Sequence, residues 1–522
     1  MKNWITFTFI IIWLGNMLWC TSNRFIDMEI TPKWFCAIFG TIIFIYTNTF
    51  KTLLKQRYRL SFVTLSWAIM LCVLSQAIYG LLQKCGICPI PSATLPMCGS
   101  FDNPAGLSSA LAFALPFGLA LTLSANRWHR FVIWTSIIII IVALILSESR
   151  AGILSSCIIF LCFFLIKRAK TSQLFIWSIA ATFAVLSVFL YLYKKDSANG
   201  RLLIWQCTWE IIKESPIIGH GSDGFEIHYM NKQADFFRQH PDSPYSLLAD
   251  NVKSPFNEYL SLCVSYGFIG ITILCAFVYI IYFAWKLHPY GNSSTSILCL
   301  LSVAIFSLFS YPFRYPHTWF FCIASICVLL HNAYPKLWHK SQLTVLSICT
   351  ISSTVIFLQS ISKIHAEMRW CEAANRSLCG LTHQMLPTYQ ELYDDLNNNP
   401  LFLYNYAAEL NIAGQYAESY RIGIESEALM ADYYTQLLQA DNCKQMKRYD
   451  DAKHYLMQAS FMCPNRFTPL YELFKIHQAE GNITGMEQTA TSILRKSIKV
   501  DSPEVRHILS EINKFILNLQ HK

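Results

Sequence analysis

The stretch FVIWTSIIIIIVALILSESRAGILSSCIIFLCFFLI, residues 131–166, decides the class of fold. Its two apolar halves flank a polar junction at 147–150, which holds Glu148 and Arg150, the charged residues of the stretch. A helix needs about 20 mostly apolar residues to cross the hydrocarbon core of a bilayer. Each half is close to that length, so the stretch predicts two membrane-spanning helices joined by a tight turn.

Similar apolar stretches recur along the first 360 residues. Together with 131–147 and 151–166 they make eleven predicted spans, the others being 4–20, 34–50, 60–82, 106–124, 173–193, 257–285, 294–310, 317–332 and 342–360. The whole chain of 522 residues is 54% hydrophobic and 14% charged. That composition excludes an ordinary soluble enzyme, whose charged fraction is near a quarter.

Connections with basic residues alternate along the chain with connections that hold acidic residues. The basic connections carry Lys51, Lys55, Arg57, Arg59, Arg127, Arg130, Lys167, Arg168, Lys170, Lys286, Lys336 and Lys340. These are expected in the cytoplasm. The acidic residues before position 194 fall in or beside the opposite connections: Asp27, Glu29, Asp102 and Glu148. With eleven spans, the N-terminus is predicted to be cytoplasmic, and the C-terminal region to lie outside, in the periplasm. The excess of lysine and arginine in these connections indicates how the chain is oriented in the membrane and does not indicate nucleic-acid binding.

The connection at 194–256 is the longest polar segment among the predicted spans. It carries seven basic and eight acidic residues, and loops of that length are usually functional. Arg201 opens an amphipathic segment within it, whose apolar residues recur at helical spacing: Leu202, Trp205, Trp209 and Ile212. Such a segment suits the membrane surface.

Three cysteines, Cys85, Cys88 and Cys98, share one predicted outer connection. An oxidising compartment would permit one disulfide there. The sequence leaves a disulfide and free thiols as equal alternatives.

From about residue 399 the pattern changes to amphipathic helices. Similar anchors recur at 414–416, 447–449 and 481–483, which are 33 and 34 residues apart, with Ala417 and Ala452 expected to allow close helix approach. The pattern resembles tetratricopeptide repeats and predicts a helical repeat domain over 361–522. Its concave surface could hold a partner or the long loop of the same chain; alternatively, the domain is a stabilising cap.

Two arginines are predicted at headgroup depth, Arg150 at the junction of two spans and Arg201 on the long loop. A planar guanidinium binds phosphate oxygens through two parallel hydrogen bonds, so two of them can neutralise a lipid-borne diphosphate. The simpler alternative for each is a snorkelling anchor or a surface ion pair, such as Arg150 with Glu148.

Four ordered segments carry a resemblance to a known family: GSFDNPAGLSSALA (99–112), SESRAGIL (147–154), the segment 200–225 that ends in ESPIIGHGSDGF, and FNEYLSLCVSYGFIG (256–270). In order and spacing they resemble the O-antigen ligase and O-antigen polymerase superfamily of membrane glycosyltransferases, which includes bacterial O-oligosaccharyltransferases. The resemblance covers most of residues 60–330.

The resemblance implies an all-α, GT-C-like transmembrane domain over 1–360, including the periplasmic loop 194–256, in the bacterial inner membrane. It implies transfer of a glycan from a polyprenyl (undecaprenyl) diphosphate carrier to an acceptor hydroxyl, with no metal or other cofactor. The acceptor would be lipid A core in lipopolysaccharide biosynthesis, a growing glycan, or a protein. Arg150 and Arg201 match the positions that grip the carrier diphosphate in this superfamily.

One departure concerns the general base. Where the superfamily commonly has His-Asn at the start of the eighth span, this chain has Phe256-Asn257. Glu258 is the first alternative base, because partial removal of a carboxylate from water makes it a stronger base. The loop histidines His220 and His228 are the second alternative, and transfer without a dedicated base is the third.

Two further residues are candidates for lining the site. Asn103, before Pro104, resembles a turn of the superfamily near the lumen, although Asn-Pro also commonly begins a turn. Arg314, in YPFRYPH, could add positive charge to the diphosphate site or could be an interface anchor among tyrosines.

The donor motifs leave three subtypes open: ligase, polymerase and protein O-oligosaccharyltransferase. The alternative of another class is a transporter or a non-catalytic membrane scaffold that presents the repeat domain. A transporter is expected to show related halves with broken helices at matching depths, whereas the polar features here gather at one outer face.

Overall fold

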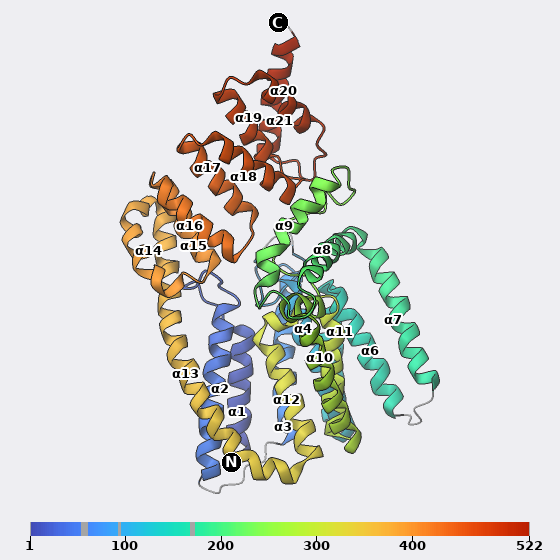
Figure 1. Cartoon of the computed structure of the whole chain (residues 1–522). Coiled ribbons are helices and arrows are strands. Elements are labelled where there is room, and N and C mark those ends of the chain that lie inside the picture. The colour runs from blue at the N-terminus through green and yellow to red at the C-terminus, as the bar shows by residue number, and fades with distance from the viewer. Residues whose placement is uncertain (1, 54–60, 92–94, 168–172, 521–522) are drawn as a thin grey trace. The chain divides into compact units, whose positions relative to one another are not determined.

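The computed structural model describes residues 2–53, 61–91, 95–167 and 173–520, and its regular elements in these ranges are all helices (Figure 1). The described chain is therefore all-α, as predicted. Five basic residues of the predicted cytoplasmic connections lie outside the described residues: Lys55, Arg57, Arg59, Arg168 and Lys170.

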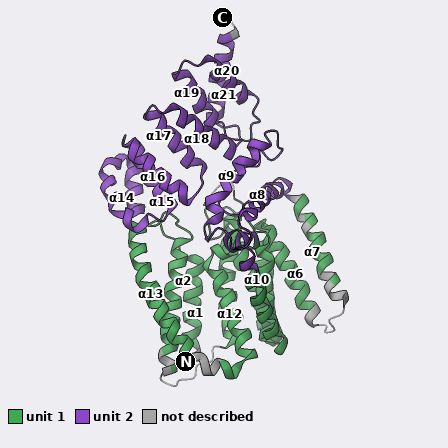
Figure 2. Cartoon of the chain, viewed as in Figure 1, with its two compact units in different colours: residues 1–193, 256–259, 272–368 green, residues 194–255, 260–271, 369–522 purple. Residues whose placement is uncertain are grey.

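The chain divides into two compact units (Figure 2). Unit 1 comprises residues 1–193, 256–259 and 272–368, and unit 2 comprises residues 194–255, 260–271 and 369–522. The predicted division assigns 194–256 to the membrane domain. In the structure, 194–255 groups with the C-terminal helices instead, because its polar side chains bond to them, as described below.

Unit 1 contains α1 (Lys2–Trp19), α2 (Thr31–Leu53), α3 (Phe62–Lys84), α4 (Pro104–Ser124), α5 (Arg127–Leu146), α6 (Arg150–Lys167), α7 (Gln173–Tyr193), α11 (Asn292–Ser307), the 3-10 turn η1 (Pro312–Arg314) and α12 (Pro316–Ala333). Two helices have residues in both units, α10 (Glu258–Leu287) and α13 (Pro335–Arg376).

Each of the eleven predicted apolar stretches overlaps one of these helices. Among the described residues, five helical segments are long and apolar enough to cross a membrane by length and composition: α3, α4, α5, α10 and residues 344–396. Shorter apolar helices occur in α1, α6 and α11. Membrane crossing thus has support at several helices, and the number eleven stays a prediction.

Helix α4 is the centre of unit 1. It packs against α3, α5, α6, α11 and α12, and its residues from Gly106 to Leu119 are buried. Many of them are glycine, serine or alanine, and small residues let neighbouring helices approach closely where lipid is the solvent. The polar groups just before α4 are therefore held by a rigid, well-packed helix.

Unit 2 contains α8 (Lys195–Glu214), α9 (Gly224–Gln239), the π-helical turn η2 (Ser377–Leu381), α14 (Thr382–Leu396), α15 (Pro400–Ile412), α16 (Tyr416–Leu429), α17 (Tyr433–Gln445), α18 (Tyr449–Met462), α19 (Thr468–Ala479), α20 (Ile483–Leu494) and α21 (Pro503–Gln520). The pairs α15/α16, α17/α18 and α19/α20 each pack together, which is consistent with repeats.

Each predicted repeat anchor forms the turn within a helix pair. Its first residue has a positive φ in all three cases: 79° at Gly414, 59° at Lys447 and 70° at Gly481. The expectation for Ala417 is wrong, because this residue is exposed, whereas Ala452 is buried. The residue 33 positions before Ala452 is Ser419, which is buried and takes the small-residue position.

The long connection lies on the repeat helices of unit 2. Gln233 of α9 is fully buried, and its Nε2 donates to the carbonyl oxygens of Met462 at 2.6 Å and Asp250 at 3.0 Å. Arg466 forms an ion pair with Asp250 at 3.0 Å. Of the interpretations of the repeat surface, these contacts favour one that holds the loop of the same chain.

The three cysteines of the connection after α3 do not form a disulfide. Cys85, Cys88 and Cys98 are free thiols, and Cys98 is buried. Of the two alternatives that the sequence leaves open, the structure has the thiols.

Candidate functional site

Arg150 begins α6, directly after the polar turn that the sequence predicts. Glu148 in this turn has a φ of 55°, which non-glycine residues rarely adopt, and its carboxylate lies 4.0 Å from Lys84 Nζ. Ser149 Oγ accepts a hydrogen bond from Ser108 Oγ of α4 at 2.7 Å. The turn is thereby tied to α4, and Arg150 is half-buried where it follows.

Asn103 caps the first turn of α4. Its Oδ1 accepts from the backbone N–H of Ala105 at 2.8 Å, which satisfies one of the free donors at a helix start. Its Nδ2 donates to Tyr311 Oη at 2.8 Å and to Asp102 Oδ2 at 3.1 Å. The cap thus connects α4 to the segment around η1, more than 200 residues later in the chain.

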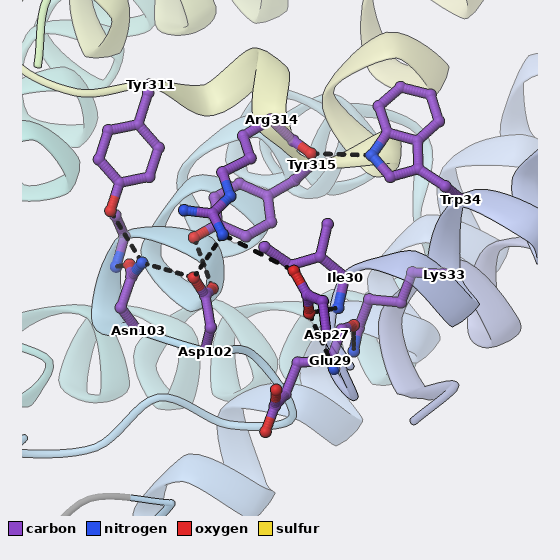
Figure 3. A network of polar contacts seen from close by, with 11 residues as sticks. Asp27, Glu29, Ile30, Lys33, Trp34, Asp102, Asn103, Tyr311, Arg314 and Tyr315 are labelled. Carbon is purple, nitrogen blue, oxygen red and sulfur yellow. Dashed lines mark hydrogen bonds and ion pairs between the residues drawn. The ribbon is translucent and has the colours of Figure 1, made fainter. Parts of the chain in front are cut away.

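Arg314 is the centre of a polar network (Figure 3). Its Nη2 lies 3.7 Å from carboxylate oxygens of both Asp27 and Asp102, and half of its side chain is exposed. Tyr315 Oη donates to Asp102 Oδ1 at 2.8 Å. Two carboxylates therefore offset the charge of Arg314, and its exposed part is available to a ligand.

Lys33 lies at the edge of the same network and is fully buried. Its Nζ donates to the carbonyl oxygens of Cys20 at 3.1 Å, Glu29 at 2.7 Å and Ser100 at 2.7 Å. All three donors of the ammonium group are used, so this lysine ties two connections together. Burial, followed by the charges of Asp27 and Asp102, raises the pKa of nearby Glu29.

Glu258 is the first residue of α10, and it faces the segment that carries Arg314. Its Oε1 accepts from the backbone N–H of Phe313 at 3.2 Å. The ring of Phe256 lies 5.3 Å from that of Tyr311 between centroids, and Asn257 Oδ1 accepts from the backbone N–H of Tyr259 at 2.9 Å. The start of α10 and the start of α4 therefore both contact residues 311–315.

Arg201 belongs to unit 2 and is half-buried on α8. The predicted apolar face of this helix is confirmed in part: Leu202 is 42% and Trp209 is 51% exposed. Ile212 is buried, and Trp205 Nε1 donates to the carbonyl oxygen of Pro255 at 2.9 Å. Both residues hold α8 against its own unit, and Ile212 is unavailable to a membrane surface because it is buried.

His220 and His228, also in unit 2, lie against each other with ring centroids 4.6 Å apart. His220 Nε2 is 2.9 Å from the carbonyl oxygen of Ile211. Because a carbonyl only accepts, Nε2 carries the proton, and Nδ1 is the atom that could take up another. Burial, together with neighbouring His220, lowers the pKa of His228.

The structure thus brings together Asn103, Glu258 and Arg314 of unit 1, because the first two contact residues 311–315, where Arg314 lies. Asn257 lies beside Glu258. The turn that precedes Arg150 contacts α4 through Ser149 and Ser108. Arg201 and His220 belong to unit 2, so the joint diphosphate site of Arg150 and Arg201 stays a prediction. Sequence reasoning missed the roles of Asp102, Tyr311 and Tyr315. The gathering of early acidic residues in the outer connections is the signal that could have indicated Asp102.

Comparison with known proteins adds a family to this geometry. Residues 135–275 match the model of the protein family described as O-antigen ligase. This segment is similar to O-antigen ligases. It includes Arg150, Arg201, His220, Asn257 and Glu258, whereas Asn103 and Arg314 lie outside it.

A curated relative matches a smaller part of the chain. It is an uncharacterized protein of Haemophilus influenzae (strain ATCC 51907 / DSM 11121 / KW20 / Rd), 30% identical over 112 residues, which are 21% of this chain and 26% of the relative. The chain spans about a quarter of the length of this relative.

Proposed function

We propose that this protein is a membrane glycosyltransferase of the O-antigen ligase type. It transfers a glycan from a polyprenyl diphosphate carrier to an acceptor hydroxyl outside the cytoplasm. The observation that carries the proposal is the match of residues 135–275 to the O-antigen ligase family, because this one segment contains both candidate diphosphate ligands, Arg150 and Arg201.

The proposed roles follow from the chemistry of the donor. Cleavage of the bond between glycan and carrier leaves negative charge on the departing diphosphate, and positive groups in place beforehand stabilise that charge. Arg150 and Arg201 are proposed to bind the two phosphates, with Arg314 as a further positive charge. Glu258 is proposed to accept the proton of the acceptor hydroxyl, with His220 as the alternative.

The proposed setting is the bacterial inner membrane, with eleven spans, a cytoplasmic N-terminus and a periplasmic loop and repeat domain. Helices α3, α4, α5 and α10 support membrane insertion by length and composition. The helix pairs of residues 400–494 support repeats of the tetratricopeptide kind. A bulky acceptor, including a protein, fits a repeat domain on the same side as the reaction.

The decisive test replaces Arg150 or Arg201 with alanine in cells that make the lipid-linked glycan. Each variant is expected to lose glycan transfer about a hundredfold or more, as when one preorganised donor to a developing anion is removed. Membrane levels of the protein should stay unchanged. Transfer is measured as glycan on lipid A core and on protein.

Arg495→Ala is the matched control, because Arg495 is an exposed arginine at the C-terminal end of α20. It should leave transfer intact. Equal transfer by all three variants would instead support a non-catalytic scaffold. Purified protein with a polyprenyl-diphosphate-linked glycan and separate acceptors then distinguishes ligase, polymerase and protein transferase, because the donor step is common to all three.

A further inference from the structure

The segment Pro216–Gly221 of the long loop is interlocked with a break in α10, and both belong to unit 2. Gly267 in α10 has a φ of 57° and a ψ of −151°, so the helix is interrupted there. An interruption leaves backbone donors and acceptors without their partners one turn away.

The loop segment takes up those backbone groups. The carbonyl oxygens of Val264 and Ser265 accept from the N–H groups of His220 at 2.8 Å and Gly221 at 3.0 Å. In the opposite direction, the N–H groups of Phe268 and Ile269 donate to the carbonyl oxygens of Pro216 at 2.8 Å and Ile217 at 3.2 Å. Four backbone hydrogen bonds thus join the loop to the helix.

The loop segment and the broken helix approach each other so closely that only glycine fits on either side of the contact. A Cβ atom on Gly219 would lie 2.4 Å from the carbonyl carbon of Ser265, and one on Gly267 would lie 2.4 Å from that of Ile217. The loop is therefore a fixed part of α10 at this point.

Apolar side chains surround the interlock and face outward. Ile217 is 64% exposed and Ile218 is 68% exposed. Tyr266, beside the break in α10, is 49% exposed. Ile269, directly beyond the break and in the same unit, is 48% exposed. The apolar surface of the loop therefore adjoins exposed apolar residues at the break in α10, a helix long and apolar enough to cross a membrane.

The length of α10 indicates the depth of the interlock. At 1.5 Å per residue, the 20 residues after Gly267 cover about 30 Å, the thickness of the hydrocarbon core. The break then lies at the outer boundary of that core. Irregular backbone is tolerated at membrane depth only where its polar groups are satisfied, and the four hydrogen bonds meet this condition.

We propose that residues 216–218 are a membrane anchor of the long loop, with Ile217 and Ile218 in the acyl-chain region of the bilayer beside the break in α10. Because Ser215 follows α8 directly, the anchor holds the end of the helix that carries Arg201 near the membrane surface. The exposed Leu202 and Trp209 of α8 lie in the headgroup region.

The test places the photocrosslinking residue p-benzoylphenylalanine at position 217 or 218 of the full-length protein. The protein is reconstituted in vesicles of phosphatidylethanolamine and phosphatidylglycerol that contain no polyprenyl diphosphate. The control position is Ile412 of α15, an isoleucine with 67% exposure and no continuity with a span. Phospholipid adducts are expected at 217 and 218 and not at 412.

Three outcomes would overturn the anchor: no lipid adduct at 217 and 218, adducts that form only after a polyprenyl diphosphate is added, or crosslinks to a second copy of the protein.

A second measurement avoids the bulky photocrosslinking residue. Ile218→Cys should resist a water-soluble maleimide in intact vesicles, since the thiolate forms in water, whereas Ile412→Cys should react. Equal labelling would refute the anchor. Neither measurement involves glycan transfer, so the anchor and the proposed enzyme can fail separately.

Discussion

Glu258 is the proposed general base, and its position differs by two residues from that of the histidine common in the superfamily that the sequence resembles. Phe256 takes the histidine position with a φ of 52° and packs its ring on Tyr311. Two residues later, Glu258 Oε1 accepts from the backbone N–H of Phe313. The carboxylate is thus held by one backbone hydrogen bond and keeps its second oxygen for another partner.

Glu258→Gln is the sharpest test of this role. The amide oxygen of glutamine can still accept from Phe313 N–H, so the local structure should persist. The variant can no longer take up a proton, and glycan transfer is expected to fall by about a hundredfold or more. The measurement is the rate of transfer by purified protein at saturating donor.

A rate for Glu258→Gln within about twofold of the parent enzyme would exclude Glu258 as the base, given the 10²–10⁴-fold that a general base typically contributes. His220→Gln and His228→Gln then test the second alternative, the loop histidines. If none of the three variants is slowed, transfer proceeds without a dedicated base, through positioning and a good leaving group.

At the scale of elements, the interlock of residues 216–221 with α10 explains two of the glycines in the family-like segments. Gly219 lies in ESPIIGHGSDGF and Gly267 in SYGFIG. Each has a positive φ, and each faces backbone atoms of the other segment. These glycines are needed to join a loop to a broken helix, and a phosphate-binding role is not needed to account for them.

Gly219→Ala is predicted to destabilise the protein much more than Gly221→Ala. Both residues have positive φ, 73° and 89°, so both alanines carry left-handed strain of about 1–2 kcal/mol. A Cβ at Gly221 meets nothing within 4 Å, whereas one at Gly219 meets backbone atoms at 2.4 Å. The clash adds about 1–3 kcal/mol.

Thermal unfolding in detergent measures the difference between these two alanine variants. The same midpoint for both would show that the backbone at 219 can move away from Ser265, and the interlock would then be a loose contact.

The docking of α9 on the repeat helices is the second element-scale feature. Gln233 accepts from Tyr229 Oη at 2.6 Å while donating to the two carbonyl oxygens of Asp250 and Met462. A buried amide with three partners fixes the position of the loop on α18.

Gln233→Leu should therefore remove a hydrogen-bond partner from the Tyr229 hydroxyl and the Met462 carbonyl, both buried, and from the carbonyl of exposed Asp250. The free energy of unfolding is expected to fall by about 2 kcal/mol or more. Gln239→Leu is the matched control at an exposed position of α9. Its free energy of unfolding should stay within about 0.5 kcal/mol of that of the parent protein.

Limited proteolysis between residues 240 and 250 provides a second readout, since this segment lies between Gln233 and its partner Asp250. Equal proteolysis of the two variants would argue against a docked loop.

At the scale of the whole molecule, we propose that glycan transfer takes place on the side of the membrane on which residues 194–255 lie. Unit 2 combines these residues with 369–522, so the loop and the repeat helices must share one compartment. The alternation of basic connections predicts that both lie outside the cytoplasm.

Reporter fusions test this orientation. Alkaline phosphatase fused after residue 242 should be active, and green fluorescent protein fused after residue 520 should be dark, because the former matures only outside the cytoplasm and the latter fluoresces only inside. Active phosphatase with a fluorescent C-terminal fusion would mean an odd number of spans after the loop, in place of the four that the sequence predicts there. Inactive phosphatase after 242 would contradict the proposed site of reaction.

The sequence by itself determined the helical class, the apolar stretches and the repeat turns. Each depends on local signals: the apolar length of 131–166, the Asn-Pro turn at 103–104 and the 33-residue spacing of Gly414 and Lys447. Helices and turns are decided by residues within a few positions of one another, so these predictions needed no partner from elsewhere in the chain.

Only the tertiary structure decided which faces are buried and which polar groups meet. Ile212 and Ala417 have the expected spacing but the opposite exposure, because packing partners distant in sequence select the buried face. Asp102 meets Arg314, and Gln233 meets Met462, across more than 200 residues. Such contacts depend on how helices pack in three dimensions, and a linear pattern carries no direct record of that packing.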